Sequence, residues 1–354
     1  MMHERGTHDR TCAVGIARGR VVATRAHGAP ARRLAMPVRG AIVRAIVRGA
    51  IVRGVRGALV ALVVMNAAAC DEPLDQRLAI VDAPRVLAVI AEPAEARPGA
   101  TVTYRAILAG PDGPITAAPT WAYCTSPKAP TEDNVVSTGC VAGDALVPLD
   151  PGADAMSATG TLPMDGCLRF GPDVPPGGFR PRDADRTGGF YQPVRVDTAA
   201  LAPLSFGLSR IICNLANATP EAFRQYSLDY VANRNPTLDA PMIDGAIVDA
   251  TTRVGADTDV TLTATWSVDS AEGYLYYDRD RQALVDRRES LRISWFATGG
   301  AFPVDSIAID EGAAETSETI TWRTPGSIGP ATLWLVLRDA RGGTAVQSAT
   351  IAIE

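Results

Sequence analysis

Apolar and polar residues alternate in short runs along two separate stretches of the chain. In the first stretch, a β-branched run over residues 85–92 ends at Pro93, and residues 101–108 place apolar side chains at every second position. A turn at residues 111–114 leads to a further run that passes through Trp121. Alternation with a period of two, interrupted by turn residues, is typical of half-buried strands. We therefore predict a β-sandwich that begins near residue 85.

The C-terminal part of the chain repeats this pattern with more strands. The runs that predict strands lie at residues 241–248, 260–266, 291–296, 318–322, 331–337 and 345–353. A turn at residues 339–343 joins the last two of these runs. Short strands separated by turns indicate a second antiparallel β-sandwich.

Between these stretches, residues 124–233 are less regular and hold four cysteines. Turn residues dominate near Pro151 and over residues 172–178. Two runs, at residues 191–196 and 204–213, are predicted to be strands that complete the first sandwich.

One short helix is predicted to start at Thr219. Its hydroxyl can cap the first turn, and Pro220 suits the first helical position. An Asn-Pro pair further along the chain ends the helix, because the residue before a proline avoids helical geometry. Phe223, Tyr226 and Tyr230 share one helical face. We expect this face to pack against the first sandwich in preference to binding a partner.

The C-terminal pattern resembles immunoglobulin-like domains of the PKD type found in bacterial surface proteins. The resemblance rests on the strand around Trp295 and on the closing hairpin over residues 333–353, and residues 85–121 look similar. It implies an all-β fold class: two immunoglobulin-like antiparallel β-sandwiches, the first with a long irregular cysteine-containing insertion and one short helix. Such sandwiches host many functions, so the resemblance does not imply an activity.

An export signal is predicted ahead of the first sandwich. Residues 57–69 form an apolar or small run, interrupted by Asn66 and preceded by several arginines. A basic segment, a short apolar segment and small residues are the parts of a signal peptide. The run is too short to cross about 30 Å of hydrocarbon as a helix.

The end of this run, Ala67-Ala68-Ala69-Cys70, resembles the bacterial lipoprotein signal, or lipobox. The resemblance implies cleavage before Cys70 and lipid on its thiol, although Ala67 stands where leucine is usual. The order of segments along the chain, a lipobox, a β module, a cysteine-containing middle and a second β module, also resembles that of uncharacterised predicted lipoproteins of high-GC bacteria. The alternatives are an ordinary secretory signal cut near Ala69 and an uncleaved membrane anchor. Translation can start at Met1 or at Met36.

These patterns predict four segments and a cellular address. The segments are an N-terminal extension with the lipoprotein signal (1–69), a lipid-anchored tether (70–84), the first sandwich with its insertion (85–233) and the second sandwich (234–354). The address is the bacterial cell envelope, on the periplasmic face or at the cell surface. A lipid on Cys70 would make the membrane a partner of the protein.

Charge and histidine content exclude several functions for the part beyond residue 69. That part holds 22 of the 34 basic and 37 of the 39 acidic residues, so its net charge is near −15. Such a surface repels phosphate backbones, and we predict no nucleic-acid partner. All three histidines, His3, His8 and His27, precede Cys70. The mature protein would therefore have no histidine for catalysis or for metal binding.

Four cysteines remain beyond Cys70, an even number that suits disulfides in an oxidising compartment. Three pairings can be drawn, and we favour Cys124–Cys140 with Cys167–Cys213 because neighbours in sequence close the shorter loops. No close pair of cysteines supports a zinc site. We predict no metal site and no cofactor.

Candidate chemistry is sparse elsewhere in the chain. No catalytic motif is present, and pairs of acidic residues lack the spacing of a calcium loop. The five tryptophans lie in strand-like runs and are expected in the cores. Tyr274, Tyr276 and Tyr277 fall in a predicted loop and form a candidate exposed aromatic patch.

We therefore predict a non-catalytic, lipid-anchored envelope protein, with no catalytic residue assigned. Its sandwiches would act as a spacer or as a binding module for an envelope protein or a glycan. One alternative is a glycan-acting hydrolase that uses carboxylates. Another is a subunit of a surface or secretion assembly.

Overall fold

The computed structural model describes residues 78–128, 136–180, 185–199 and 201–354. All of them belong to one compact unit that spans residues 70–354. The predicted signal and Cys70 lie outside the described residues. None of the helices in the described ranges has both the length and the apolar character needed to span a membrane.

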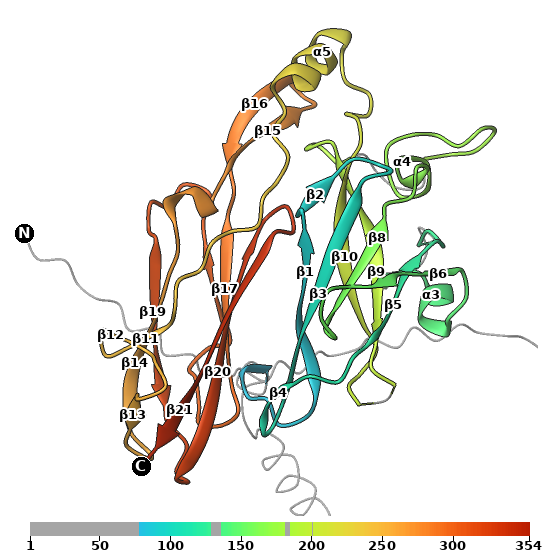
Figure 1. Cartoon of the computed structure of the whole chain (residues 1–354). Helices are drawn as coiled ribbons and strands as arrows, with labels where there is room; N and C mark the ends of the chain where they lie inside the picture. Colours follow the sequence, from blue (N-terminus) through green and yellow to red (C-terminus); the bar gives the residue numbers. More distant parts are fainter. Residues whose placement is uncertain (1–77, 129–135, 181–184, 200) are drawn as a thin grey trace, which may run out of the picture. The chain divides into compact units, whose positions relative to one another are not determined.

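Two sheets form the first sandwich (Figure 1). One sheet has the order β1-β3-β8-β7, with β4 paired to β3, and the other has the order β2-β10-β9-β5-β6. The strands are β1 (Arg85–Glu92), β2 (Glu95–Ala96), β3 (Thr101–Gly110), β4 (Gly113–Ile115), β5 (Thr120–Cys124), β6 (Leu146–Pro148), β7 (Asp150–Pro151), β8 (Ser157–Thr161), β9 (Gly189–Asp197) and β10 (Ser205–Ile212).

Two further sheets form the second sandwich, with the orders β12-β11-β14-β19 and β13-β21-β20-β17-β18. A separate hairpin, β15–β16, is inserted between β14 and β17. The strands are β11 (Met242–Ile243), β12 (Ala246–Ile247), β13 (Arg253–Val254), β14 (Asp259–Thr265), β15 (Gly273–Asp278), β16 (Ala283–Arg288), β17 (Leu291–Ala297), β18 (Ser306–Ile309), β19 (Ser317–Arg323), β20 (Gly329–Asp339) and β21 (Thr344–Ile353).

Both sandwiches have the immunoglobulin-like strand order. In the first, β1, β3, β8 and β7 take the places of strands A, B, E and D, while β5, β9 and β10 take those of C, F and G. In the second, β11, β14 and β19 correspond to A, B and E, and β17, β20 and β21 to C, F and G. Each sandwich also has a short strand, β2 or β13, that runs parallel to its last strand. The predicted fold class is therefore confirmed.

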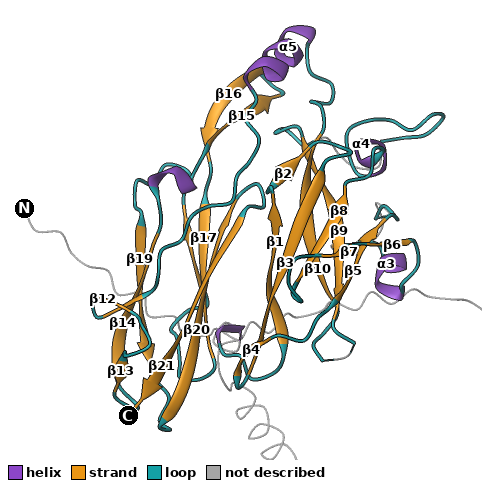
Figure 2. Ribbon diagram, viewed as in Figure 1, coloured by secondary structure: helices purple, strands orange, loops and turns teal. Residues whose placement is uncertain are grey.

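Among the described residues, helices are few and short (Figure 2). They are α3 (Thr138–Ala142), α4 (Gly166–Arg169), α5 (Pro220–Asp229) and a single 3-10 turn, η1 (Val268–Ser270). The predicted helix is α5, and the hydroxyl of Thr219 accepts a hydrogen bond from the backbone N–H of Ala222. The expectation that it packs against the first sandwich is incomplete. Its buried Ala222 and Tyr226 cluster with Leu215 and with Tyr277 of the β15–β16 hairpin, which belongs to the second sandwich.

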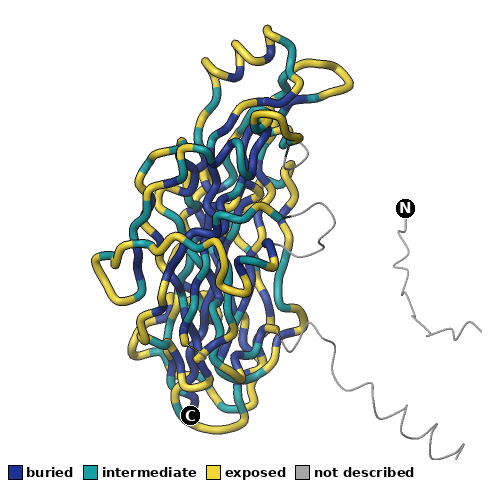
Figure 3. The backbone as a smooth tube through the Cα atoms, turned by 90° about the vertical axis from the view of Figure 1, so that its right-hand side faces the viewer, coloured by how far each residue is buried: buried dark blue, intermediate teal, exposed yellow. Residues whose placement is uncertain are grey.

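Each sandwich has its own core. The buried residues lie mostly along the inside of the folded chain, and exposed residues lie at its loops (Figure 3). All five tryptophans are buried, which confirms their expected place in the protein interior. Four of them belong to these two cores, and the fifth, Trp334, does not. It points away from its own sandwich and packs with Val81, Leu87 and Ala109, which precede or belong to the first sandwich. The outer face of β20 is therefore covered by the first sandwich.

Two disulfides join Cys124 to Cys140 and Cys167 to Cys213. This is the pairing that the sequence favoured. The first bond holds α3 to the end of β5, and the second holds α4 beside the end of β10. Both bonds fix irregular segments of the first sandwich to its sheets.

Two segments differ from their sequence-based description. The irregular region contains β8, a full member of the first sandwich, which the sequence hides because Ser157–Thr161 has almost no apolar residue. The range predicted to be a tether is packed at its end, since Ala79 and Val81 are fully buried. In addition, the backbone N–H of Val81 donates to Ala297 of the second sandwich at 2.8 Å.

Candidate functional site

The chain passes between the two sandwiches after α5, and a charge network surrounds it there. Glu95, in β2, is buried and accepts hydrogen bonds from the Nε of Arg210 at 2.8 Å and from the hydroxyl of Tyr230 at 2.6 Å. It also accepts from the backbone N–H of Asn233 at 2.8 Å. A single carboxylate of the first sandwich therefore holds the connecting segment by two of its residues.

Arg341 approaches the same carboxylate from the second sandwich. It lies in the turn between β20 and β21, and its Nη1 is 3.8 Å from Oε2 of Glu95. Its Nε donates to Glu289 at 2.7 Å, and its Nη2 donates to Glu272 at 3.3 Å. Its Nη1 also donates to the carbonyl of Val231 at 3.2 Å. One buried guanidinium therefore contacts both sandwiches and the segment between them.

Arg210 extends the network into the first sandwich. Its Nη2 donates to the hydroxyl of Thr187 at 2.6 Å, and its Nη1 donates to Asp185 at 3.3 Å and to the hydroxyl of Tyr191 at 3.2 Å. That hydroxyl in turn donates to the carbonyl of Arg341 at 3.0 Å. The two buried arginines are therefore linked through Glu95 and through Tyr191.

Asp339 closes the turn that carries Arg341. Its Oδ1 accepts from the backbone N–H of Arg341 at 2.9 Å and from that of Gly343 at 2.8 Å. The side-chain amide of Asn233 donates to Oδ2 at 3.1 Å. A Cβ at Gly343 would lie 2.0 Å from Oδ2, so this close approach of backbone and carboxylate requires glycine.

Burial raises the pKa of two carboxyls in the network, Glu289 and Asp339. Removal from water, together with the nearby Asp339, raises the pKa of Glu289 to about 7 although Arg341 opposes the shift. Burial also raises the pKa of Asp339 above its ordinary value, against hydrogen bonds from Asn233 and two backbone N–H groups. The two carboxyls lie around the same arginine, so their titrations are interdependent.

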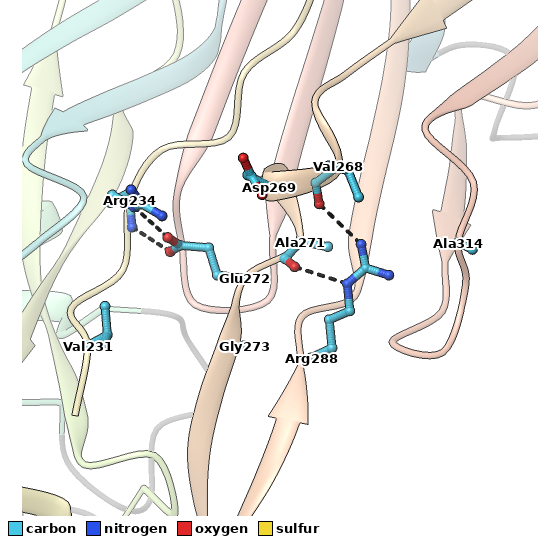
Figure 4. Close-up of a pocket in the computed structure, with 9 residues that line it drawn as sticks. All are labelled: Val231, Arg234, Val268, Asp269, Ala271, Glu272, Gly273, Arg288 and Ala314. Atoms are coloured by element: carbon cyan, nitrogen blue, oxygen red, sulfur yellow. Dashed lines mark hydrogen bonds and ion pairs between the residues drawn. The ribbon is translucent and has the colours of Figure 1, made fainter. Parts of the chain in front are cut away.

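An open hollow of about 460 Å³ borders this network (Figure 4). Glu272 and Arg234 meet at its wall, where Nε of Arg234 donates to one carboxylate oxygen at 2.6 Å and its backbone N–H donates to the other at 2.9 Å. Arg288 supports the opposite side by donating to the carbonyls of Ala271 at 3.0 Å and Val268 at 3.2 Å. The walls of the hollow are therefore fixed by an ion pair and by hydrogen bonds from an arginine to backbone carbonyls.

The surface of the hollow mixes exposed apolar side chains with one exposed guanidinium. Val231 is 61% and Val268 60% exposed, and the side chain of Arg234 is 74% exposed. A smaller hollow of about 310 Å³ shares Arg234, Asp269 and Glu272 with the first. Together these features suit contact with side chains or sugars of a partner, because apolar area and a few polar groups are combined in a concave surface.

Two of the three buried acids of the network are held in ion pairs. Glu95 and Glu289 each accept from a guanidinium and from a backbone N–H inside the protein. Glu272 is the network acid that lines the hollow, and it accepts from two arginines. In the described part of the chain, no group of three or more histidine, cysteine, aspartate or glutamate side chains is placed to hold a metal ion.

The predicted aromatic patch is wrong in two respects. Tyr274, Tyr276 and Tyr277 lie in strand β15 and not in a loop. Tyr277 is only 2% exposed, because α5 covers it. Tyr276 has the guanidinium of Arg287 over its ring at 4.5 Å, with that of Arg186 at 5.6 Å. Tyr274 packs under Arg341 at 5.2 Å, so the face of its ring belongs to the charge network.

Sequence reasoning did not identify the charged residues of the network. A usable signal was present at Arg210, which is the one charged residue in the otherwise uncharged run over residues 204–213. A lone charge at a strand position that points inward must find a buried partner. No comparable signal marks Glu95 or Arg341, which lie beside turns.

Comparison with known proteins adds the following. No protein family and no curated protein matches the sequence. Among solved structures, the superoxide reductase (neelaredoxin) T24K from Ignicoccus hospitalis matches with 13% identity and a TM-score of 0.21, over 36% of this chain and 86% of its own. The Yersinia pseudotuberculosis adhesin InvE matches with 13% identity and a TM-score of 0.20, over 76% and 58%. The D0-D1 domain of intimin matches with 10% identity and a TM-score of 0.19, over 75% and 98%. At these scores the matches carry no inference about activity.

Proposed function

We propose that this chain is a non-catalytic envelope protein, anchored by lipid on Cys70, whose paired sandwiches hold a binding surface away from the membrane. The surface is the hollow around Arg234, Val231 and Val268. Its partner would be an envelope protein or a glycan. The observation that carries the proposal is the position of this hollow relative to Leu78, which lies eight residues after Cys70.

The hollow and Leu78 lie at opposite ends of the strands. Arg85, at the start of β1, donates to the carbonyl of Leu78 at 2.7 Å, whereas the carbonyl of Ala91, near the end of β1, accepts from Asn235 at 2.8 Å. Asn235 is next to Arg234 of the hollow. Figure 1 shows the same arrangement, with α5 and the β15–β16 hairpin at the end opposite to β4.

The second sandwich has the same polarity. Ile80 pairs with Ala297 at the end of β17, while Leu291 at its start follows Glu289 of the network closely. A strand of this length spans about 20 Å at roughly 3.3 Å per residue. The chain enters the fold at this end, so we propose that a lipid on Cys70, eight residues before Leu78, anchors the end of the protein that is remote from the hollow.

Two further observations support the proposal. The two disulfides indicate that the folded part resides outside the cytoplasm. The tightly paired carboxylates support a binding role more than a carboxylate-based hydrolase. In particular, Glu272 at the hollow is held by ion pairs to Arg234 and Arg341 at once.

Site-specific photocrosslinking in cells tests the binding surface. A photoreactive residue at Val268 is expected to capture one discrete partner, whose mass and sugar content identify it as protein or glycan. The matched control is Ile328, which is 77% exposed and lies next to β20 at the end near Ala297. Capture at Ile328 but not at Val268, or equal capture at both, would contradict the assignment of the hollow.

A further inference from the structure

We propose that the junction is a proton-operated latch: Glu289 and Asp339 share one bound proton while the sandwiches are docked, and losing it loosens the docking. The inference rests on the composition of the buried network and not on the proposed binding role. It concerns the chain as it folds, with or without a lipid anchor.

The inner part of the network holds more negative than positive groups. Among the described residues, two guanidiniums, Arg210 and Arg341, face three buried carboxyls, Glu95, Glu289 and Asp339. If all five were ionised, one negative charge would remain without a buried counter-charge. Such a charge is costly inside a protein, and binding one proton removes it.

Among the described residues, the neighbouring arginines have other partners: Arg287 pairs with Glu311, and Arg288 and Arg338 donate to backbone carbonyls. Arg234 pairs with Glu272 at the hollow, and Asp185 occupies the outer side of Arg210. Several charged or titratable groups surround Glu289 and Asp339. Those nearest are Arg341 from the β20–β21 turn, Glu272 and Tyr274 at the start of β15, and Tyr191 from β9. Glu95 from β2 and Tyr230 after α5 lie beyond Arg341. Glu272 is balanced by Arg234, and the tyrosines are uncharged because burial raises the pKa of each of them, so none of these groups supplies a further counter-charge.

Glu95 has the most cationic partners of the three carboxyls, because both arginines contact it, and it also accepts from the backbone N–H of Asn233. Glu289 bonds one guanidinium and one backbone N–H, and Asp339 bonds only uncharged donors. The proton is therefore assigned to the pair Glu289 and Asp339. Opening the junction would expose both to water and return them to ordinary carboxyl behaviour.

The direction of the pH effect follows from the shift at Glu289. Its pKa is about 7 in the docked protein, against an ordinary value of 4.5. Between these two values the docked state binds more protons than the open state, so docking weakens as the pH rises through the window. Below the window both states are protonated and above it neither is, so the dependence levels off at each side.

Hydrogen exchange of the purified full chain between pH 5 and pH 8.5 measures the latch. Protection factors, which remove the intrinsic pH dependence of exchange, are read at the amides of Asn233, Arg341 and Gly343 because these bond Glu95 or Asp339. We expect the opening constant to rise by up to about tenfold per pH unit between pH 5 and pH 7, and then to level off.

Two variants assign the proton, and one controls for surface charge. Glu289→Gln keeps an acceptor for Arg341 but cannot titrate, so its protection should not vary between pH 5 and pH 7. Asp339→Asn tests the other member of the pair. Glu315→Gln, at an exposed position, should retain the dependence of the parent protein. Loss of the dependence in either junction variant supports the latch. A flat profile in the parent protein, or an unchanged slope in both junction variants, would overturn it.

Discussion

Replacing Arg341 by methionine is expected to lower the free energy of unfolding by about 3–5 kcal/mol. The variant removes a buried guanidinium from Glu95, Glu289 and Glu272 while leaving these carboxyls in place. Methionine has a similar length, so the loss measures unpaired charge more than lost volume. Equilibrium denaturation in urea, followed by tryptophan fluorescence and by circular dichroism, measures the change.

The matched control for this variant is Arg234→Met. Arg234 also pairs with Glu272, but its side chain is 74% exposed, and an exposed ion pair contributes at most about 1 kcal/mol. A loss at Arg341 as small as the loss at Arg234 would show that the junction charges do not hold the sandwiches together.

Replacing Trp334 by alanine is expected to cost about 3–5 kcal/mol, the usual range for a buried tryptophan. The physical reason differs from that of a core residue, because Trp334 packs on Val81 and Leu87 and not within its own sandwich. Its removal should therefore loosen the contact between sandwiches. Hydrogen exchange along β1 should speed up together with the loss of stability.

Trp295→Ala provides the comparison for this second variant. Trp295 is fully buried in the core of the second sandwich, so its loss should cost a similar amount while β1 keeps its protection at low denaturant. If Trp334→Ala left β1 as protected as Trp295→Ala does, the packing of the two sandwiches would contribute little to their stability.

Much of the fold could be predicted because it depends on local signals. A β-branched run identifies β1, alternating runs identify β3 and β14, and a hydroxyl followed by proline identifies the start of α5. Neighbouring cysteines pair because short loops close at low entropic cost. In contrast, β15 and β16 were missed because their polar and tyrosine-rich sequence has no clear alternation.

The junction could not be predicted because its partners are far apart along the chain. The bond between Glu95 and Asn233 joins residues 138 positions apart, and that between Arg210 and Glu95 spans 115. One feature of the sequence does indicate that the two sandwiches pack against each other. The strand around Trp334 is apolar at nearly every position from 331 to 337, as expected for a strand covered on both faces.

The most direct test of the proposed function is the mass of the protein extracted from membranes of the cells that make it. We predict an N-terminal peptide that begins at Cys70 and carries the mass of a diacylglyceryl group on its thiol. A soluble product that still contains His27, or one in which Cys70 is free of lipid, would contradict both the anchor and the orientation of the hollow away from the membrane.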